Sequence, residues 1–189
     1  MKKWFLFMSL MLVLGVLGAC GNKETGPDTD KGNSGNQEVS LEDIFQQTKD
    51  TMAADLKEDG VEEPLMDGKL ASYFEINLTD KDNQDREFYL EKLGITEDQL
   101  EAGYVIAAMM NVNADEIIML EAKDETAVAA LKAALEKELS AQTQTWEQYL
   151  PDQFDKVKNN VIKQNGNKLM YITYDQPEKI AEIFDAKTK

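Results

Sequence analysis

Cys20 is the residue of this chain with the most distinctive chemistry, because it is the only cysteine among 189 residues. It directly follows Leu17, Gly18 and Ala19. An ordinary signal-peptide cleavage site needs small residues both at Ala19 and at the position that Leu17 occupies. The run instead has the form of a bacterial lipobox, in which the cysteine sulfur receives a diacylglyceryl group and becomes part of the new N-terminal residue. We therefore predict lipid attachment at Cys20.

The residues before Cys20 have the organisation of a cleavable export signal. Lys2 and Lys3 give a positive start, and the apolar run from Trp4 to Leu14 is shorter than the roughly 20 residues that span a bilayer. Two acyl chains, each stabilised by about 0.8 kcal/mol per buried methylene, anchor a protein that one chain would release. We predict a signal peptide over 1–19 and a lipid-anchored position on the extracytoplasmic face of the cell membrane.

The remainder divides into a short polar segment and one domain. Residues 20–39 contain almost no large apolar side chain, so they cannot bury enough surface to fold, and we predict a flexible tether carrying the lipidated Cys20. Residues 40–189 have a length that suits one domain with a single core. No internal repeat with a solenoid or propeller period is visible.

The residues required for most catalytic chemistry are missing. The chain has no histidine, which removes Ser-His-Asp and Cys-His catalysis and imidazole metal sites. A lipidated Cys20 offers no thiolate for zinc or iron–sulfur centres. None of the serines that follow the signal precedes a lysine at the spacing of a Ser-x-x-Lys nucleophile. We therefore expect no catalytic residues, no metal and no cofactor, and a protein that is not an enzyme.

The charge of the chain restricts its partners. Asp and Glu number 36 against 20 Lys and Arg, which gives a net charge of −16. Such a surface repels phosphate backbones, and no concentrated Lys/Arg patch offsets that repulsion. We expect no nucleic-acid partner.

Acidic side chains leave one alternative open. Asp80, Asp82 and Asp85 crowd one loop, and Glu91 falls at the twelfth position counted from Asp80, as in a calcium-binding loop. The match fails at Gln84, which replaces a ligand, and at Asp85, where the turn requires glycine. A carboxylate-only hydrolase or a calcium-binding domain therefore stays as the alternative to a binding module.

Two further sets of residues could form a binding surface. Methionines on the expected strands could make a soft apolar patch, and aromatic residues near the end of the long helix and on the last strand could make a platform. For both sets, core packing is the simpler interpretation. The methionines are Met109, Met110, Met119 and Met170, and the aromatic residues are Trp146, Tyr149, Tyr171 and Tyr174.

Capping residues and apolar spacing predict the helices. Ser40 and Asp43 form a capping box for a first helix with apolar residues every fourth position. Asp124 caps a long helix that ends at Pro151, and Pro177 starts a closing helix. Shorter helical pieces are expected at 88–93 and 96–101.

Alternating and continuous apolar runs predict the strands. They are expected at 70–78, 103–112, 116–122, 161–163 and 168–174. The strand at 103–112 is apolar on both faces and should be central, hairpinned to 116–122; Asn165-Gly166 signals a second hairpin. We predict an α+β domain with an antiparallel sheet of about four to five strands, and a long helix and two shorter helices packed mainly on one face.

Several of these patterns together resemble a bacterial family called domain of unknown function 4358, over roughly 43–185. The patterns are Asp115-Glu116-Ile117-Ile118 with Met119, the helix from Asp124, Tyr149-Leu150-Pro151, and Gly166 to Tyr171 before Asp175. The resemblance implies a fold and a Gram-positive lipoprotein, with no assigned activity and no catalytic residues to carry over.

We therefore expect a lipid-anchored extracytoplasmic protein that acts without catalysis, as a binding or accessory module at the cell envelope. Its expected partners are the membrane, through the lipid on Cys20, and an envelope protein or a small ligand.

Overall fold

A computed structural model describes residues 39–189 of the chain. The predicted signal peptide, Leu17, Gly18, Ala19, Cys20 and nearly all of the predicted tether lie outside the described residues. Among residues 39–189, no helix is long and apolar enough to cross a membrane. The elements are α1 (Leu41–Glu58), β1 (Leu65–Met66), β2 (Lys69–Leu70), β3 (Tyr73–Asn77), α2 (Arg86–Leu93), a 3-10 turn η1 (Glu97–Gln99), β4 (Leu100–Ala108), β5 (Glu116–Ala122), α3 (Glu125–Glu147), α4 (Pro151–Lys158), β6 (Val161–Asn165), β7 (Lys168–Thr173) and α5 (Pro177–Lys187).

Five of the strands form one antiparallel sheet in the order β3-β4-β5-β7-β6. Both predicted hairpins are present: β4 pairs with β5, and β6 pairs with β7. In the second hairpin Asn165 pairs with Lys168, so the turn residues are Gly166 and Asn167, one position later than the sequence suggested. Gly166 has a φ of 56°, which a residue without a side chain adopts most easily. The predicted α+β class with an antiparallel sheet is confirmed.

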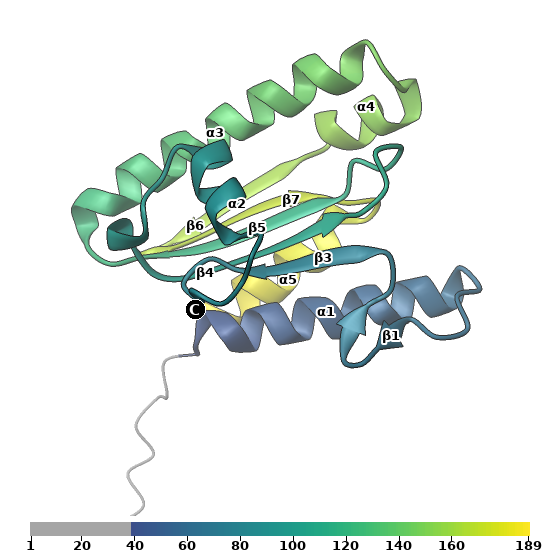
Figure 1. Cartoon of the computed structure of the whole chain (residues 1–189), viewed down its shortest axis with the longest axis horizontal. Helices are drawn as coiled ribbons and strands as arrows, with labels where there is room; N and C mark the ends of the chain where they lie inside the picture. The colour runs from purple at the N-terminus through teal and green to yellow at the C-terminus, as the bar shows by residue number, and fades with distance from the viewer. Residues whose placement is uncertain (1–38) are drawn as a thin grey trace, which may run out of the picture. The chain divides into compact units, whose positions relative to one another are not determined.

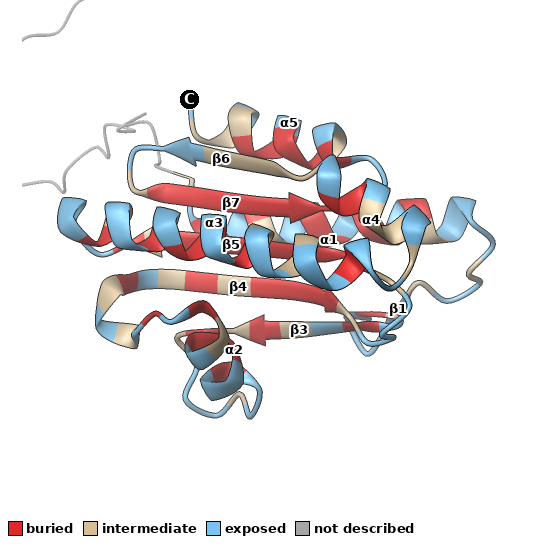
Figure 2. Cartoon of the chain, turned by 90° about the horizontal axis from the view of Figure 1, so that it is seen from above, coloured by how far each residue is buried: buried red, intermediate tan, exposed pale blue. Residues whose placement is uncertain are grey.

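The helices cover both faces of this sheet, which differs from the expected packing mainly on one face (Figure 1). α1 and α5 pack against Met119, Met170 and Ile172, whereas α2 and α3 pack against Ile118 and Tyr171 on the opposite face. The reason is that the central strands are apolar on both sides: every residue of β7 is buried, as is nearly all of β5 (Figure 2). A strand of this composition requires cover on each face.

The helix ends follow the predicted caps. Ser40 and Asp43 form a capping box at the start of α1, and the Asp124 side chain accepts a hydrogen bond from the Ala127 N–H at 2.9 Å. Pro151 does more than end a helix, because it also occupies the first turn of α4, which the sequence analysis did not predict. Proline suits that position since it needs no amide hydrogen there.

A two-stranded ribbon, β1 and β2, was also not predicted. Its strands are only two residues long, and the ribbon is tied to α1 by Lys49, whose Nζ donates to the Gly68 carbonyl at 2.6 Å. The same ammonium pairs with Glu75 of β3 at 2.8 Å, and Glu75 in turn accepts a hydrogen bond from the Leu70 N–H. These contacts hold the ribbon beside the start of β3.

Candidate functional site

Exposed apolar side chains gather at one end of the domain. With the exception of Phe88, the large apolar residues that are exposed lie in β1, at the start of β3, in the β4–β5 turn and just after α3. Figures 1 and 2 both place these segments at the same end of the sheet. The residues are Leu65, Met66, Phe74, Met109, Met110, Val112 and Tyr149. Single exposed apolar residues are ordinary on a protein surface, but their collection at one end makes this end a candidate interaction surface.

A groove lies within this end, beside β3, and has a volume of about 420 Å³. Phe74 and Met109 supply its apolar surface, and both side chains are at least two-fifths exposed. The loop between β3 and α2 supplies its polar wall. The full lining is Lys69, Tyr73, Phe74, Glu75, Asp80, Asp82, Asn83, Gln84, Asp85 and Met109. We call this cavity the β3 groove.

The backbone of β3 is open toward the β3 groove. Two hydrogen bonds fix the alternation along the strand: Met109 N–H to the Ser72 carbonyl at 3.0 Å, and Leu78 N–H to the Gly103 carbonyl at 2.8 Å. In an antiparallel pair, residues bonded to the neighbouring strand alternate with residues whose backbone groups point outward. Tyr73 and Glu75 therefore direct their N–H and C=O groups away from β4. Within residues 39–189 the sheet ends at β3, so no strand pairs with them.

The wall of the β3 groove is acidic. Asp80 accepts a hydrogen bond from the Asp82 N–H at 3.0 Å, which shapes the loop and leaves the Asp82 and Asp85 side chains exposed. In the described part of the chain, no lysine or arginine forms an ion pair with these three aspartates. Lys69 is the one cationic side chain among the described lining residues. The groove thus combines an apolar surface with an excess of negative charge.

A buried network holds Tyr73 at the start of β3. The Tyr73 hydroxyl donates to Asp115 Oδ2 at 2.6 Å, and Lys156 of α4 pairs with Asp115 Oδ1 at 2.6 Å. Burial and the Asp115 carboxylate both raise the pKa of the Tyr73 phenol, which therefore stays a hydrogen-bond donor. Asn113 also donates to Asp115, at 3.0 Å. These contacts fix the strand that presents Phe74.

A second buried network contains two carboxylates and one lysine. Lys92 of α2 lies 2.5 Å from Glu116 Oε1 at the start of β5 and 3.0 Å from Glu138 Oε1 of α3. Gln142 donates to Glu138 at 2.6 Å, and Trp146 donates to Gln142 at 2.8 Å. Burial raises the pKa of Glu116 to about 7. The Lys92 ammonium lowers this pKa in part, and the Glu138 carboxylate raises it further. The network joins α2 and α3 to the sheet.

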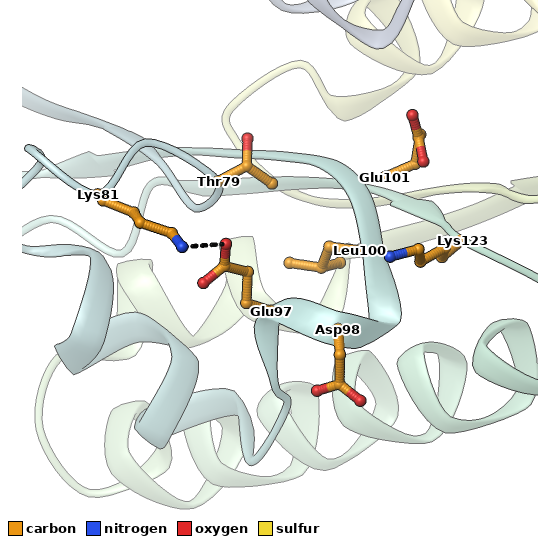
Figure 3. Close-up of a pocket in the computed structure, with 7 residues that line it drawn as sticks. All are labelled: Thr79, Lys81, Glu97, Asp98, Leu100, Glu101 and Lys123. Carbon is orange, nitrogen blue, oxygen red and sulfur yellow. Dashed lines mark ion pairs between the residues drawn. The ribbon is translucent and has the colours of Figure 1, made fainter.

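A larger cavity, of about 570 Å³, has a different character (Figure 3). Its lining is Thr79, Lys81, Glu97, Asp98, Leu100, Glu101 and Lys123. Leu100 is the one large apolar side chain among these residues, and Lys81 pairs with Glu97 across the opening at 3.5 Å. Because its two lysines offset most of the charge of its three acidic residues and little apolar surface is available, this cavity is a weaker candidate than the β3 groove.

The family described as "Domain of unknown function (DUF4358)" matches residues 74–174, more than half of the chain. This chain belongs to that family. The match is narrower than the resemblance expected over 43–185, since it begins in β3 and ends just after β7. It includes Phe74, Met109 and the acidic loop of the β3 groove, and it excludes α1 and α5. No curated protein and no solved structure matches the chain.

The structure of this DUF4358 domain separates the residues of the possible calcium loop. Asp80, Asp82 and Asp85 line the β3 groove, whereas Glu91 lies on α2 and lines a different cavity with Arg86. Among residues 39–189, no group of three or more acidic residues is arranged to hold a metal ion. The loop instead contributes negative charge to the groove.

The four methionines and the four aromatic residues considered as binding surfaces each include both buried and exposed side chains. Met119 and Met170 face each other in the sheet and are fully buried, while Met109 and Met110 are exposed in the β4–β5 turn. Tyr149 is exposed beside the buried Trp146, with ring centroids 5.7 Å apart. Tyr171 and Tyr174 belong to the cores on opposite faces of the sheet, so the four aromatic residues form no common platform.

Sequence reasoning missed Glu138 and the open edge of β3. Glu138 lies on the same buried face of α3 as Leu131 and Leu135. A charged residue at a position where the helical periodicity predicts an apolar one was the signal that could have identified it. The edge position of β3 has no such local signal, because it depends on which strands pair. Cys20 and the preceding Leu17, Gly18 and Ala19 lie outside the described residues, so lipid attachment stays a prediction.

Proposed function

We propose that this protein is a lipid-anchored, extracytoplasmic binding or accessory module of the cell envelope that acts without catalysis. The Leu17-Gly18-Ala19-Cys20 sequence supports the anchor, since a lone cysteine at that position has a covalent role available to it. The binding role rests on one observation: the β3 groove joins exposed apolar side chains to an unpaired strand edge. A soluble domain gains nothing in stability from such a surface, and it risks aggregation.

The charge of the β3 groove favours a protein partner over an anionic lipid surface. α1 has 18 residues and extends about 27 Å at 1.5 Å per residue. The described chain begins at the N-terminal end of α1, and the β1–β2 ribbon follows its C-terminal end (Figure 1). The apolar end of the domain therefore lies away from residue 39, the first residue that the structure describes.

A hydrolase that uses carboxylates alone is the second candidate, and the raised pKa of Glu116 favours it. A general acid near neutral pH needs such a shift, but it must also reach a substrate. Glu116 and Glu138 are both about 4% exposed, and Lys92 and Gln142 contact both oxygens of Glu116 and Oε1 of Glu138. This arrangement supports a structural role for the pair, and so a non-enzymatic protein.

The anchor is tested by replacing its attachment residue. Cys20→Ser should abolish both lipid attachment and cleavage after Ala19, because Leu17 makes a poor ordinary cleavage site. Intact-mass analysis of protein extracted from membranes should show that the natural chain starts at Cys20 and carries a diacylglyceryl mass. The variant should retain residues 1–19. Ser34→Ala, in the predicted tether, serves as the matched control and should be processed normally; an unmodified Cys20 in the natural chain would overturn the proposal.

A further inference from the structure

We infer that the β3 groove receives an extended, lysine- or arginine-bearing segment of a partner protein, which adds to the sheet as a strand beside β3. The inference rests on the binding role proposed above and names the class of partner that fits the site. Three features of the β3 groove support this inference: the open backbone of β3, the apolar side chains beside it and the negative charge of the neighbouring loop.

The two edge strands of the sheet, β3 and β6, differ in how far other residues cover them. At the β6 edge, Lys163 pairs with Asp185 of α5 at 2.7 Å, and the Asn165 side chain donates to the Thr188 carbonyl at 2.7 Å. Charged residues and covering segments of this kind are the usual protection of an edge strand. β3 instead ends the sheet with an exposed Phe74.

The open backbone groups of β3 have the spacing that an added strand requires. Tyr73 and Glu75 are two residues apart and point the same way, so an incoming extended chain can bond to both. Phe74, between them, projects from the same face of the sheet as Ile76, which packs in the core under α2 and α3. A side chain of the added strand would lie against Phe74 on that face.

The charge of the β3 groove selects a basic segment. A lysine or arginine on the added strand can lay its aliphatic stem on Phe74 while its charged head reaches Asp82 or Asp85. The whole chain has a net charge of −16, so a second copy and an anionic lipid surface are both repelled. A basic partner is attracted by the same field.

The test uses a capped peptide of five Lys-Val repeats as the probe and the full-length protein in detergent. Isothermal titration should detect binding that weakens as salt is added, whereas the corresponding Glu-Val peptide should not bind. A Lys-Val peptide that is N-methylated at alternate residues, so that it cannot donate to β3, should bind about tenfold more weakly or worse. In hydrogen-exchange NMR, the Tyr73 and Glu75 amides should become protected when the first peptide binds.

Paired variants separate the contributions of charge and apolar contact. Asp82→Asn with Asp85→Asn should weaken binding about tenfold, while Glu147→Gln with Glu178→Gln, which removes the same charge from exposed positions elsewhere, should not. Phe74→Ser should weaken binding, and Phe88→Ser, which changes the other exposed phenylalanine, should not. Circular dichroism checks that each variant folds.

Three outcomes would overturn the inference: equal binding of the Glu-Val peptide, equal binding of the N-methylated peptide, or unchanged binding by the Asp82/Asp85 variant. Each of these leaves the mass of the lipidated N-terminus untouched, so failure of the strand-addition site is distinct from failure of the anchor. Protection of Tyr73 and Glu75 without added peptide would show that a second copy already occupies the edge, and that too would contradict a basic partner.

Discussion

Replacing Lys92 by methionine should lower the free energy of unfolding by about 3–5 kcal/mol at pH 8. Burial disfavours the charge of Lys92, but the attraction of Glu116 and Glu138 outweighs it and raises the pKa of this lysine. Removing the ammonium leaves two carboxylates in a site where each is about 4% exposed. A buried charge without a partner is among the largest single penalties in a folded protein.

Urea denaturation followed by circular dichroism measures this effect, and the unfolding midpoint should fall while the slope stays constant. Lys132→Met is the matched control: Lys132 is half exposed and lies 4.0 Å from Glu136, so its loss should cost less than about 1 kcal/mol. Adding Glu116→Gln to Lys92→Met should restore part of the loss, because the two sites interact directly. Equal midpoints for Lys92→Met and Lys132→Met would show that water reaches the carboxylates.

Features that depend on local spacing could be predicted from the sequence. The capping box of Ser40 and Asp43, the cap at Asp124 and the strand at 116–122 occur where they were expected. Each is determined by residues a few positions apart, through hydrogen bonds or periodic burial. The sequence also predicted the α+β class, because hairpin turns and long apolar strands imply an antiparallel sheet.

Features that depend on contacts between distant segments could not be predicted in the same way. The strand at 103–112 was recognised as apolar on both faces, yet the helices were still expected mainly on one. The structure assigns α1 and α5 to one face and α2 and α3 to the other, an outcome that only the packing of the whole chain decides. α4 was missed because Pro151 was interpreted solely as the end of a helix.

The candidate site also combines features that local spacing predicts with features that depend on distant segments. Phe74 and Met109 are 35 positions apart in the chain, and no local pattern of residues indicates that they line one cavity. Pairing of β3 with β4 brings them together and leaves β3 at the edge. The acidic loop was noticed as a calcium candidate, whereas its position beside an unpaired strand makes it the charged wall of a groove. The predicted lipid-attachment motif at Cys20 consists of adjacent residues and can be recognised in a sequence, whereas a surface made from separate segments cannot.

Glu116→Gln should stabilise the protein relative to the natural chain, and the difference should grow as the pH rises from about 4.5 to about 7. In this range the folded protein holds a proton at Glu116 that the unfolded chain has released, so the stability of the natural chain falls as pH increases. Glutamine keeps the size of the protonated acid and does not ionise. Above pH 7 the difference should level off at a value on the order of 3 kcal/mol.

The measurement is a set of urea denaturation curves for both proteins between pH 4 and pH 9, compared as a difference at each pH so that other titrating groups cancel. Glu147→Gln, which removes the same carboxyl group from an exposed position of α3, is the control. A constant or falling difference for Glu116→Gln would mean that the attraction of Lys92 fully offsets the cost of burying Glu116 as an ionised carboxylate. A rising one would show that a single lysine cannot neutralise two buried carboxylates, so that the junction of α2, α3 and β5 retains a proton close to neutral pH.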